Sequence, residues 1–316
     1  MKEGKKSKIV VIGGGTGVFT VLSGLKKYPL DLAAVVSMAD DGGSTGTLRE
    51  EFGILPPGDI RRALVAMSHS DNRLLSDLFN YRFEQGGLRG HAFGNILITA
   101  LERVTGSFEE AVEEAGRILG VGGAVLPVTL SSVKLCARLQ DGSIVRGETN
   151  IDIPKHDGGL RIKKIWLEPK ATLNNKARQA ILSADLLVIG PGDLYTSIVP
   201  NLIVEGAKEA IKKSKAKKVY VANLMTKWGE THSFAAKDFI QAVESYVGRG
   251  VLDYVIINTK RPSSQRLKHY ESEFSQFVGT QNLLSKPVPV FGDFLRRQGF
   301  VRHDPDRLAE VLVSLL

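Results

Sequence analysis

The chain has 316 residues, of which 43% are hydrophobic and 24% are charged, a composition that excludes disordered and fibrous proteins. Its formal net charge is +8, but the lysines and arginines stand in short runs without interleaved aromatic residues, which does not indicate a nucleic-acid surface. Cys136 is the only cysteine, which excludes an internal disulfide or a cysteine-rich metal site and suits a reducing cytoplasm.

The first predicted element is a strand over residues 9–12, which follows the basic start MKEGKKSK. This apolar run is too short for a signal peptide or a membrane span, so we expect a cytoplasmic protein without membrane insertion. Similar β-branched runs recur at residues 32–36, 186–189, 219–222 and 254–257. Continuous apolar runs of this length predict strands that are buried on both faces of a parallel sheet.

Helical patterns alternate with these strands, which favours an α/β fold with βαβ units and helices on both faces of a mostly parallel sheet. The pattern predicts helices over residues 17–27, 108–119, 202–213, 234–246 and 305–315. Ser107 is expected to cap the second of these helices, with Glu110 three residues further on.

The middle of the chain has a different pattern. Residues 133–140 and 143–149 flank Asp141-Gly142, a strong hairpin signal, and residues 161–167 form another predicted strand. We therefore expect a β-rich insertion at about residues 123–168 within one domain that spans residues 1–316. Residues 260–289 show little periodicity and are expected to wrap over the edge of the site.

Two glycine-rich clusters follow the first two predicted strands. The first is GGGTG, where glycines let a ligand approach the backbone and the start of a helix favours a phosphate; it comprises Gly13, Gly14, Gly15, Thr16 and Gly17. The second is ADDGGSTG, in which an acidic residue can bind a ribose hydroxyl and the following residues can form an anion nest; it contributes Asp40, Asp41, Gly42, Gly43, Ser44 and Thr45.

Two further motifs leave alternatives open. In PPGDIRR, Asp59 either caps the following helix or contacts ligand, and Arg61 is expected to face a phosphate. In GHAFGN, His91 is either a proton carrier or a packed, hydrogen-bonding residue. Gly94 and Asn95 of the same motif precede an apolar helix and are counted as candidate ligand contacts.

The last two clusters follow the strands predicted at 186–189 and 219–222. The motif GPGDLYTSIVPN offers a glycine loop, hydroxyls and an amide through Gly190, Pro191, Gly192, Tyr195, Thr196, Ser197 and Asn201. The segment after it offers Asn223, Thr226 and Glu230. In open α/β sheets ligands bind beyond the carboxyl ends of the strands, so these clusters are expected to meet in one crevice.

No combination of residues predicts a catalytic group. The sequence has no Gly-x-Ser-x-Gly elbow, no cysteine–histidine pair and no zinc-type spacing, so no resident metal site is predicted. The only cofactor expected is Mg²⁺ that accompanies a bound nucleotide, held by Asp40, Asp41 and Asp59 through a phosphate.

Taken in order, the motifs resemble those of the YvcK-type gluconeogenesis factors within the CofD-like superfamily. The matching segments include GGGTG, ADDGGSTG, PPGDIR, GHAFGN, GPGDLYTSIVPN, the Asn223–Thr231 pattern and Arg302-His303-Asp304, so they cover almost the whole chain. The chain departs from the family pattern at Arg62, at Asp193, where many relatives have serine, and at Lys227-Trp228.

The resemblance implies a Rossmann-like fold in a cytoplasmic protein that is needed for cell shape and envelope synthesis during growth on non-glycolytic carbon sources. It implies binding of UDP-sugars such as UDP-N-acetylglucosamine, with Tyr270 and Arg302 as further ligand contacts. It also implies a homodimer, and a sensor of this kind would regulate a metabolic partner enzyme.

Two other functions remain open at this stage. One is a CofD-like transferase that joins a guanosine-activated phospholactate to a deazaflavin. The other is an NAD-dependent oxidoreductase, which Val18 at the third glycine position of the dinucleotide fingerprint disfavours.

Overall fold

A computed structural model describes residues 6–68, 73–281, 283 and 285–316 of the chain, so part of the basic N-terminal start lies outside the described residues. Its centre is a seven-stranded sheet in the order β10-β9-β8-β7-β1-β2-β3. The strands are β1 (Lys8–Gly13), β2 (Asp31–Val36), β3 (Gly123–Pro127), β7 (Leu186–Ile189), β8 (Lys217–Val221), β9 (Tyr254–Asn258) and β10 (Val288–Gly292). Every neighbouring pair is parallel, as the apolar runs predict.

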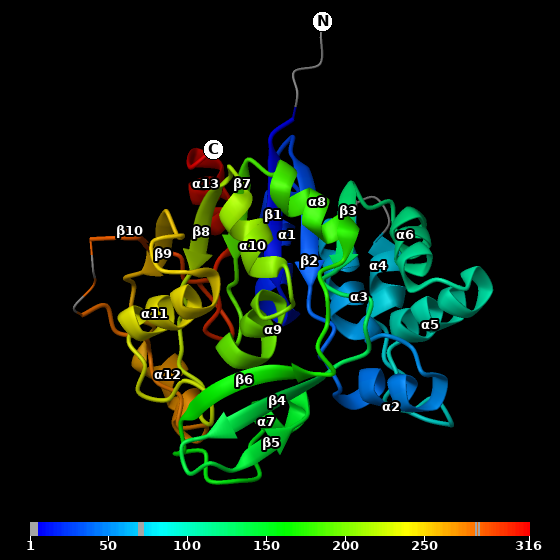
Figure 1. Cartoon of the computed structure of the whole chain (residues 1–316), viewed down its shortest axis with the longest axis horizontal. Helices are drawn as coiled ribbons and strands as arrows, with labels where there is room; N and C mark the ends of the chain where they lie inside the picture. The colour runs from blue at the N-terminus through cyan, green and yellow to red at the C-terminus, as the bar shows by residue number, and fades with distance from the viewer. Residues whose placement is uncertain (1–5, 69–72, 282, 284) are drawn as a thin grey trace, which may run out of the picture.

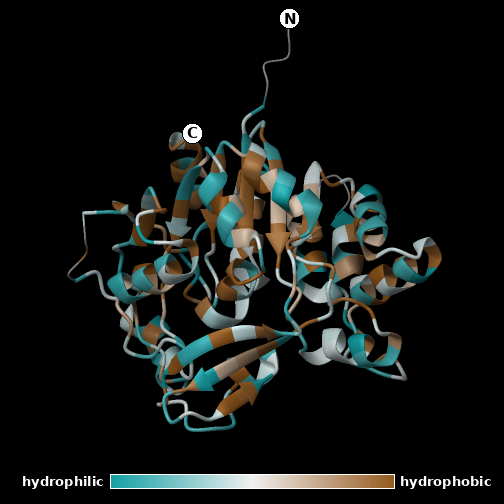
Figure 2. Cartoon of the chain, in the orientation of Figure 1, coloured by the Kyte–Doolittle hydropathy of each residue, from teal (hydrophilic) through white to brown (hydrophobic). Residues whose placement is uncertain are grey.

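Helices cover both faces of the sheet, which confirms the predicted Rossmann-like α/β fold (Figure 1). Alternate residues of β1 belong to different cores: Ile9 and Val11 pack on one side, Val10 and Ile12 on the other. One side holds α1 (Gly15–Leu25), α3 (Pro57–Met67), α4 (Arg73–Asn80), α5 (Phe93–Thr105), α6 (Phe108–Ile118) and α13 (Pro305–Ser314). The other holds α8 (Asn175–Ser183), α9 (Val199–Leu202), α10 (Ala207–Lys213) and α11 (Ala236–Val247). Figure 2 shows this arrangement as apolar strands between helices with polar outer surfaces.

A second, antiparallel sheet lies beyond the carboxyl ends of the large one (Figure 1). It has the order β5-β4-β6 and comprises β4 (Lys134–Leu139), β5 (Ile144–Arg146) and β6 (Ile162–Glu168), with the short helix α7 (Glu148–Asp152) beside it. The hairpin at Asp141-Gly142 forms as predicted, and the Ser143 N–H donates to Asp141 Oδ1 at 2.9 Å. However, β3 pairs with β2 in the large sheet, so the β-rich segment begins later than the expected residue 123.

The prediction of one continuous helix over residues 202–213 is wrong. The structure has α9, a break, and then α10. Gly206 at the break has a φ of +92°, a left-handed conformation that ends the helical path and that glycine adopts without steric cost. Several elements were not predicted from sequence: α2 (Gly43–Phe52), α4, α7, α8, α12 (Ser264–Glu271) and β10. Among the described residues, no helix is long and apolar enough to cross a membrane.

The contact between α1 and α13 depends on a glycine. A Cβ at Gly24 would lie 2.1 Å from the carbonyl oxygen of Pro305. An alanine in a helix normally stabilises the helix relative to glycine, but here it would force the two helices apart. Gly24→Ala is therefore expected to lower the free energy of unfolding by about 1–3 kcal/mol, measured by urea denaturation.

Gly116 in α6 provides the matched control, because its nearest Cβ neighbour would be Leu64 Cδ2 at 3.4 Å. Gly116→Ala is expected to be neutral or stabilising. Equal destabilisation by both substitutions would contradict this account of the α1–α13 contact.

Candidate functional site

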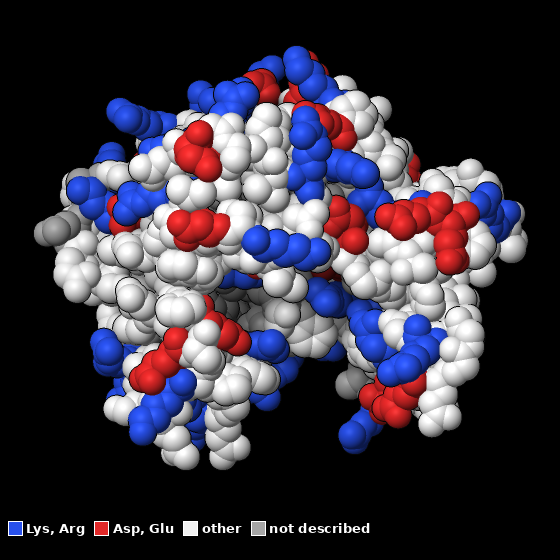
Figure 3. Space-filling model, turned by 90° about the horizontal axis from the view of Figure 1, so that it is seen from below, with Lys and Arg blue, Asp and Glu red and all other residues white. Residues whose placement is uncertain are grey.

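A cavity of about 570 Å³ lies at the carboxyl ends of β1, β2 and β7. From β1 the chain continues to β2 and β3 on one side, and the later strands β7 to β10 are added on the other. The order therefore reverses between β1 and β7, which is where open α/β sheets bind ligands. Figure 3 shows this end of the molecule hollowed between two lobes, with lysines and arginines on the rim.

The structure brings most of the predicted site residues to this cavity. Sixteen of them line it: Gly14, Gly15, Thr16, Gly17, Asp40, Gly42, Gly43, Ser44, Thr45, Asp59, Arg61, Asn95, Gly192, Thr196, Ser197 and Arg302. A smaller adjoining cavity of about 180 Å³ is lined by two more, Pro191 and Asn223. Thr16, Gly17, Gly192 and Arg302 line both cavities, so the two form one crevice.

Two glycine loops touch through their backbones: the first glycine loop, residues 13–17, and the second glycine loop, residues 190–193. A Cβ at Gly17 would lie 1.9 Å from the carbonyl oxygen of Pro191, so the start of α1 approaches the second loop as only glycine allows. Gly15 has a φ of +62° and opens α1. The first N–H groups of a helix have no partner within the helix, and the N-terminus carries a partial positive charge. The loops thus place the positive end of the α1 dipole at the cavity.

The two adjacent aspartates of ADDGGSTG have different positions. Asp40 faces the cavity, and its Oδ1 accepts a hydrogen bond from the Gly42 N–H at 2.9 Å. Asp41 turns away and accepts from the N–H groups of Glu148 at 3.1 Å and Thr149 at 2.9 Å. Asp41 therefore caps the start of α7. It also connects that helix to residues 42–45, which follow Asp41 in the ADDGGSTG motif.

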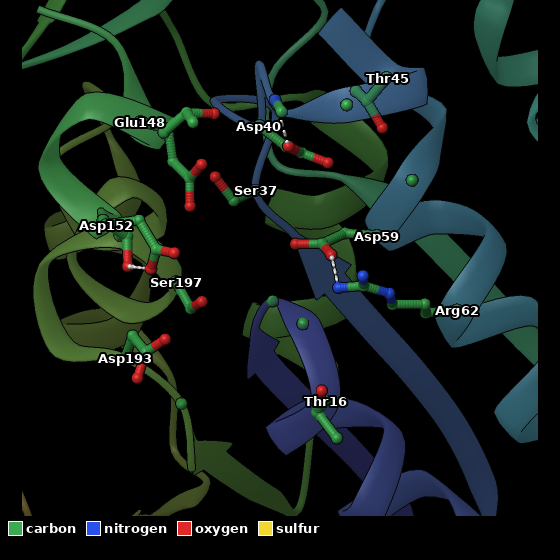
Figure 4. A pocket seen from close by; sticks show the side chains of 18 of the residues that line it. Thr16, Ser37, Asp40, Thr45, Asp59, Arg62, Glu148, Asp152, Asp193 and Ser197 are labelled. Atoms are coloured by element: carbon green, nitrogen blue, oxygen red, sulfur yellow. Dashed lines mark hydrogen bonds and ion pairs between the residues drawn. The ribbon is translucent and has the colours of Figure 1, made fainter. Parts of the chain in front are cut away.

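Asp59 lies in the first turn of α3, after Pro56 at the N-cap, and its side chain does not cap α3. Its carboxylate accepts a hydrogen bond from the backbone of Gly15, at the start of α1. Asp59 also faces the cavity (Figure 4). Burial raises the pKa of Asp59 to about 6, with Asp40 raising it further and Arg62 and the Gly15 backbone acting against the rise. Burial also raises the pKa of Asp40. Two carboxylates that share a partly desolvated space favour a proton or a cation between them.

Arg61 is buried, and its guanidinium is hydrogen-bonded within the wall of the cavity. Its Nε donates to Asn95 Oδ1 at 2.9 Å and its Nη1 to Asn80 Oδ1 at 2.6 Å. Burial lowers the pKa of Arg61 to about 10, so it remains charged at neutral pH. Arg61 thus joins α3, α4 and α5 and supplies positive charge to the cavity, since its hydrogen bonds go to the neutral groups of Asn95, Phe79 and Asn80.

The other predicted residues stand behind the cavity wall. His91 Nδ1 lies 3.2 Å from Ser44 Oγ, which is the packed, hydrogen-bonding alternative. Tyr270 accepts at its hydroxyl from the Val301 N–H at 2.8 Å and so supports the segment that carries Arg302. The remaining members of this group line neither cavity: Gly13, Asp41, Gly94, Gly190, Tyr195, Asn201, Thr226 and Glu230.

The buried side chain of Glu230 holds the segment that follows the second glycine loop through hydrogen bonds. Its carboxylate accepts from the Tyr195 N–H at 2.9 Å and from Thr196 Oγ1 at 3.0 Å. These residues begin a π-helix, η2 (Leu194–Ile198), an irregular element that is frequent at functional sites. Asn223 Nδ2 donates to the Gly192 carbonyl at 2.7 Å and holds the same loop from the side.

Sequence reasoning missed the part of the wall that comes from α7. Glu148, Thr149, Asp152 and Ile153 line the cavity, as do Ser37, Gly58 and Arg82. Burial raises the pKa of Glu148 to about 9, with Asp152 and Asp40 adding to the rise. No motif marks these residues, because only the antiparallel sheet brings them to the crevice.

Asp193 and Lys227, two departures from the family pattern, contact each other. Lys227 Nζ lies 2.9 Å from Asp193 Oδ2 and also pairs with Asp152. The negative charge of Asp193 near an anion site therefore has a cationic partner.

The chain is similar in sequence and in structure to known proteins. The family model described as 2-phospho-L-lactate transferase CofD matches residues 9–290. The gluconeogenesis factor of Bacillus subtilis is 41% identical over 319 residues, which cover 99% of each chain. A relative from Clostridium acetobutylicum is 44% identical over 317 residues, 99% of this chain and 70% of the relative. A crystal structure of a Bacillus halodurans protein superposes with a TM-score of 0.93 at 40% identity, covering 98% of this chain and all of the other. These findings confirm the resemblance inferred from the motifs.

Arg61 gives a direct test of how the cavity wall is held. Arg61→Ala removes a buried guanidinium and leaves Asn95 and Asn80 without their donor. We expect the free energy of unfolding to fall by about 2–4 kcal/mol in urea denaturation.

Arg117→Ala is the control, because Arg117 is 79% exposed in a surface ion pair with Glu114; its expected effect is within about 0.5 kcal/mol. If Arg61→Ala were as mild as the control, Arg61 would not be a structural link between the three helices.

Proposed function

Since the chain belongs to the CofD family and is related along its whole length to gluconeogenesis factors, we propose that it is a regulatory protein that binds a nucleotide sugar. The ligand is of the UDP-N-acetylglucosamine type. Binding changes the affinity of the protein for a metabolic partner enzyme and adjusts envelope synthesis, and with it cell shape, during gluconeogenic growth in the cytoplasm. A ligand can do this only by differential affinity for two states of the protein.

The observation that carries the proposal is the convergence of two glycine loops and two helix starts on one crevice. Residues 14–17 begin α1, residues 42–45 begin α2, and Gly192 to Ser197 lie opposite. Unpaired backbone N–H groups at helix starts suit the two phosphates of a nucleoside diphosphate. Arg62, Arg82 and Arg302 also line the cavity and supply positive charge to it.

The two compartments match the two ends of a nucleotide sugar. The smaller cavity is bounded by Leu224, Met225 and Val301 together with the amide of Asn223, which suits a flat base with polar edges. The larger cavity is bounded by Asp40, Glu148 and Asp152, whose carboxyl groups suit sugar hydroxyls. The shared residues Thr16 and Gly192 lie where the diphosphate would join the two parts.

A divalent cation is expected to arrive with the ligand. Asp40 and Asp59 both face the large cavity, and a Cβ at Gly58 would lie 2.7 Å from Asp40 Oδ2, so glycine keeps this carboxylate accessible. Mg²⁺ is typically held by one or two carboxylates plus substrate phosphates, and these residues fit that donor set. Bound Mg²⁺ would offset phosphate charge; the chain's own part is to hold the two carboxylates in place.

A CofD-type transferase is the second candidate. The name of the matched family model favours it, and so do three carboxyl groups, Asp40, Asp59 and Glu148, directed into the space where an acceptor hydroxyl would lie. Transfer of phospholactate from a guanosine-activated donor to a deazaflavin, followed by chromatography, would establish this activity.

Thermal unfolding with matched concentrations of UDP-N-acetylglucosamine, UDP-glucose, GDP and NADH tests the proposal. A ligand at about 100 times its dissociation constant adds about 2.7 kcal/mol to stability, and we expect this shift with UDP-sugars. Arg302→Ala should weaken UDP-sugar binding about tenfold, because it removes a charge-assisted contact.

Arg297→Ala, an exposed neighbour that lines neither cavity, is the control and should bind normally. Stabilisation by GDP alone would favour the transferase, and stabilisation by NADH alone the oxidoreductase. No shift with any of the four ligands would remove the nucleotide-sugar proposal.

The affinity for UDP is also expected to depend on pH through Glu148. Its raised pKa of about 9 keeps the carboxyl group neutral at pH 7. As pH rises towards 9 the group gains negative charge in the cavity that also holds the diphosphate, and this charge repels the phosphates across the cavity, so UDP binding should weaken by about fivefold.

Isothermal titration calorimetry of the wild type and Glu148→Gln at pH 7 and pH 9 measures this effect. Titration of the ligand itself is common to both proteins and cancels in their ratio. Parallel pH profiles for the two proteins would show that Glu148 does not face the phosphates.

A further inference from the structure

A single lysine lies among three carboxylates at one wall of the crevice. Lys227 Nζ contacts Asp152 Oδ1, Asp193 Oδ2 at 2.9 Å and Glu230 Oε1 at 3.7 Å. One oxygen from each of the three carboxylates lies within 4.8 Å of the others. The four residues come from three separate segments: α7, the second glycine loop and the segment after β8.

Two of these carboxylates belong to the ligand cavity itself. Asp152 and Asp193 line it next to Gly192 and Ser197, on the loop that faces the start of α1 (Figure 4). Glu230 is fully buried behind them. Without a cation, this wall would present two negative charges to a ligand at the second glycine loop, and those charges would repel phosphate.

The ammonium of Lys227 offsets part of this negative charge. Burial acts to lower the pKa of Lys227, but Glu230, Asp193 and Asp152 outweigh it and raise the pKa above its ordinary value, so the group is charged. Burial and the neighbouring aspartates act to raise the pKa of Glu230, and the ammonium of Lys227 opposes that rise. Lys227 therefore reduces the net negative charge of the cluster by one.

We propose that Lys227 is a specificity-determining residue: its ammonium offsets Asp152 and Asp193 and thereby lets a phosphate-bearing ligand bind against the second glycine loop. The inference rests on the proposed function only in that the ligand of the crevice carries phosphate. It assigns to Lys227 the selection of the ligand's charge, whichever base the ligand has.

A purely structural role makes a different prediction. The Lys227 N–H donates to Thr231 Oγ1 at 3.0 Å, and Glu230 holds the start of η2, so Lys227 could serve only to fasten these segments. If Lys227 had only this structural role, its replacement would weaken the binding of every ligand by the same factor. Loss of a charge would weaken ligands in proportion to their own charge.

The experiment therefore compares uridine, UMP, UDP and inorganic pyrophosphate by calorimetry at pH 7 and low ionic strength. Lys227→Gln should leave uridine unchanged, weaken UMP by about threefold and weaken UDP and pyrophosphate by about tenfold. Lys163→Gln, which removes an exposed lysine of β6, is the control for net charge and should change none of them.

Removing the partner charge provides the reverse test. Asp193→Ser should strengthen UDP binding several-fold. The double variant Asp193→Ser/Lys227→Gln removes one charge of each sign, restores the net charge of the wild-type cluster and should bind UDP like the wild type. Far-ultraviolet circular dichroism and urea denaturation establish that each variant is folded. If Lys227→Gln alone does not fold, the Asp193→Ser variant and the double variant carry the test.

Equal weakening of uridine and UDP in Lys227→Gln, or no recovery in the double variant, would overturn the inference and leave the proposed function intact. A wild type that binds GDP and pyrophosphate but no uridine compound would overturn the proposed ligand instead, and the same comparison would then use guanosine, GMP and GDP. A wild type that binds no member of either series, pyrophosphate included, would overturn both.

Discussion

The crevice depends on the backbone contact between Gly17 and Pro191. Because β1 and β7 are neighbours in the sheet, the loops that follow them leave from the same edge. At Gly17 any side chain would begin 1.9 Å from the Pro191 carbonyl oxygen, so only glycine lets the start of α1 lie against the second loop. This contact places a helix start, with its unpaired N–H groups, opposite the turn that leads into η2. The cavity, its positive wall and its adjoining compartment are all arranged around that meeting point.

The antiparallel sheet supplies the opposite wall and gives the site its mixed charge. Asp41 caps α7 and thus connects the small sheet to the loop after β2. Through α7, Glu148 and Asp152 reach a cavity whose other side holds Arg61, Arg62 and Arg82. Glu148 and Asp152 lie across the cavity from Arg62, which pairs with Asp59 at 3.3 Å (Figure 4). This mixture of carboxyl and guanidinium groups suits a ligand that carries both phosphates and hydroxyls. Under the proposed function, the raised pKa of Glu148 and the ammonium of Lys227 would both reduce the negative charge that an anionic ligand meets on this side of the cavity.

The sequence predicted those features that follow from local patterns. Strands such as Leu186–Ile189 are buried on both faces and read as continuous apolar runs, and the glycine loops after them carry their own conformational signature. Sequence-based prediction missed elements whose formation depends on contacts between distant parts of the chain. The edge strand β10 contains Pro289 and exposes Phe291, so it lacks a buried-strand pattern, and α7 has too few residues for helical periodicity. The adjacency of Asp40 and Asp41 does not reveal that one faces the cavity and the other caps a helix. Likewise, the pairing of Asp193 with Lys227 joins residues that only the tertiary structure brings together.

A crystal structure of the protein with UDP-N-acetylglucosamine would test the central claim most directly. The account predicts electron density for the two phosphates in the cavity beside Gly15, Thr16 and Gly192, at the start of α1. It places the base towards Asn223 and the sugar towards Glu148 and Asp152. Phosphates bound elsewhere, for example in the cavity beside Lys26 at the amino ends of the strands, or a diphosphate that contacts neither glycine loop, would contradict it.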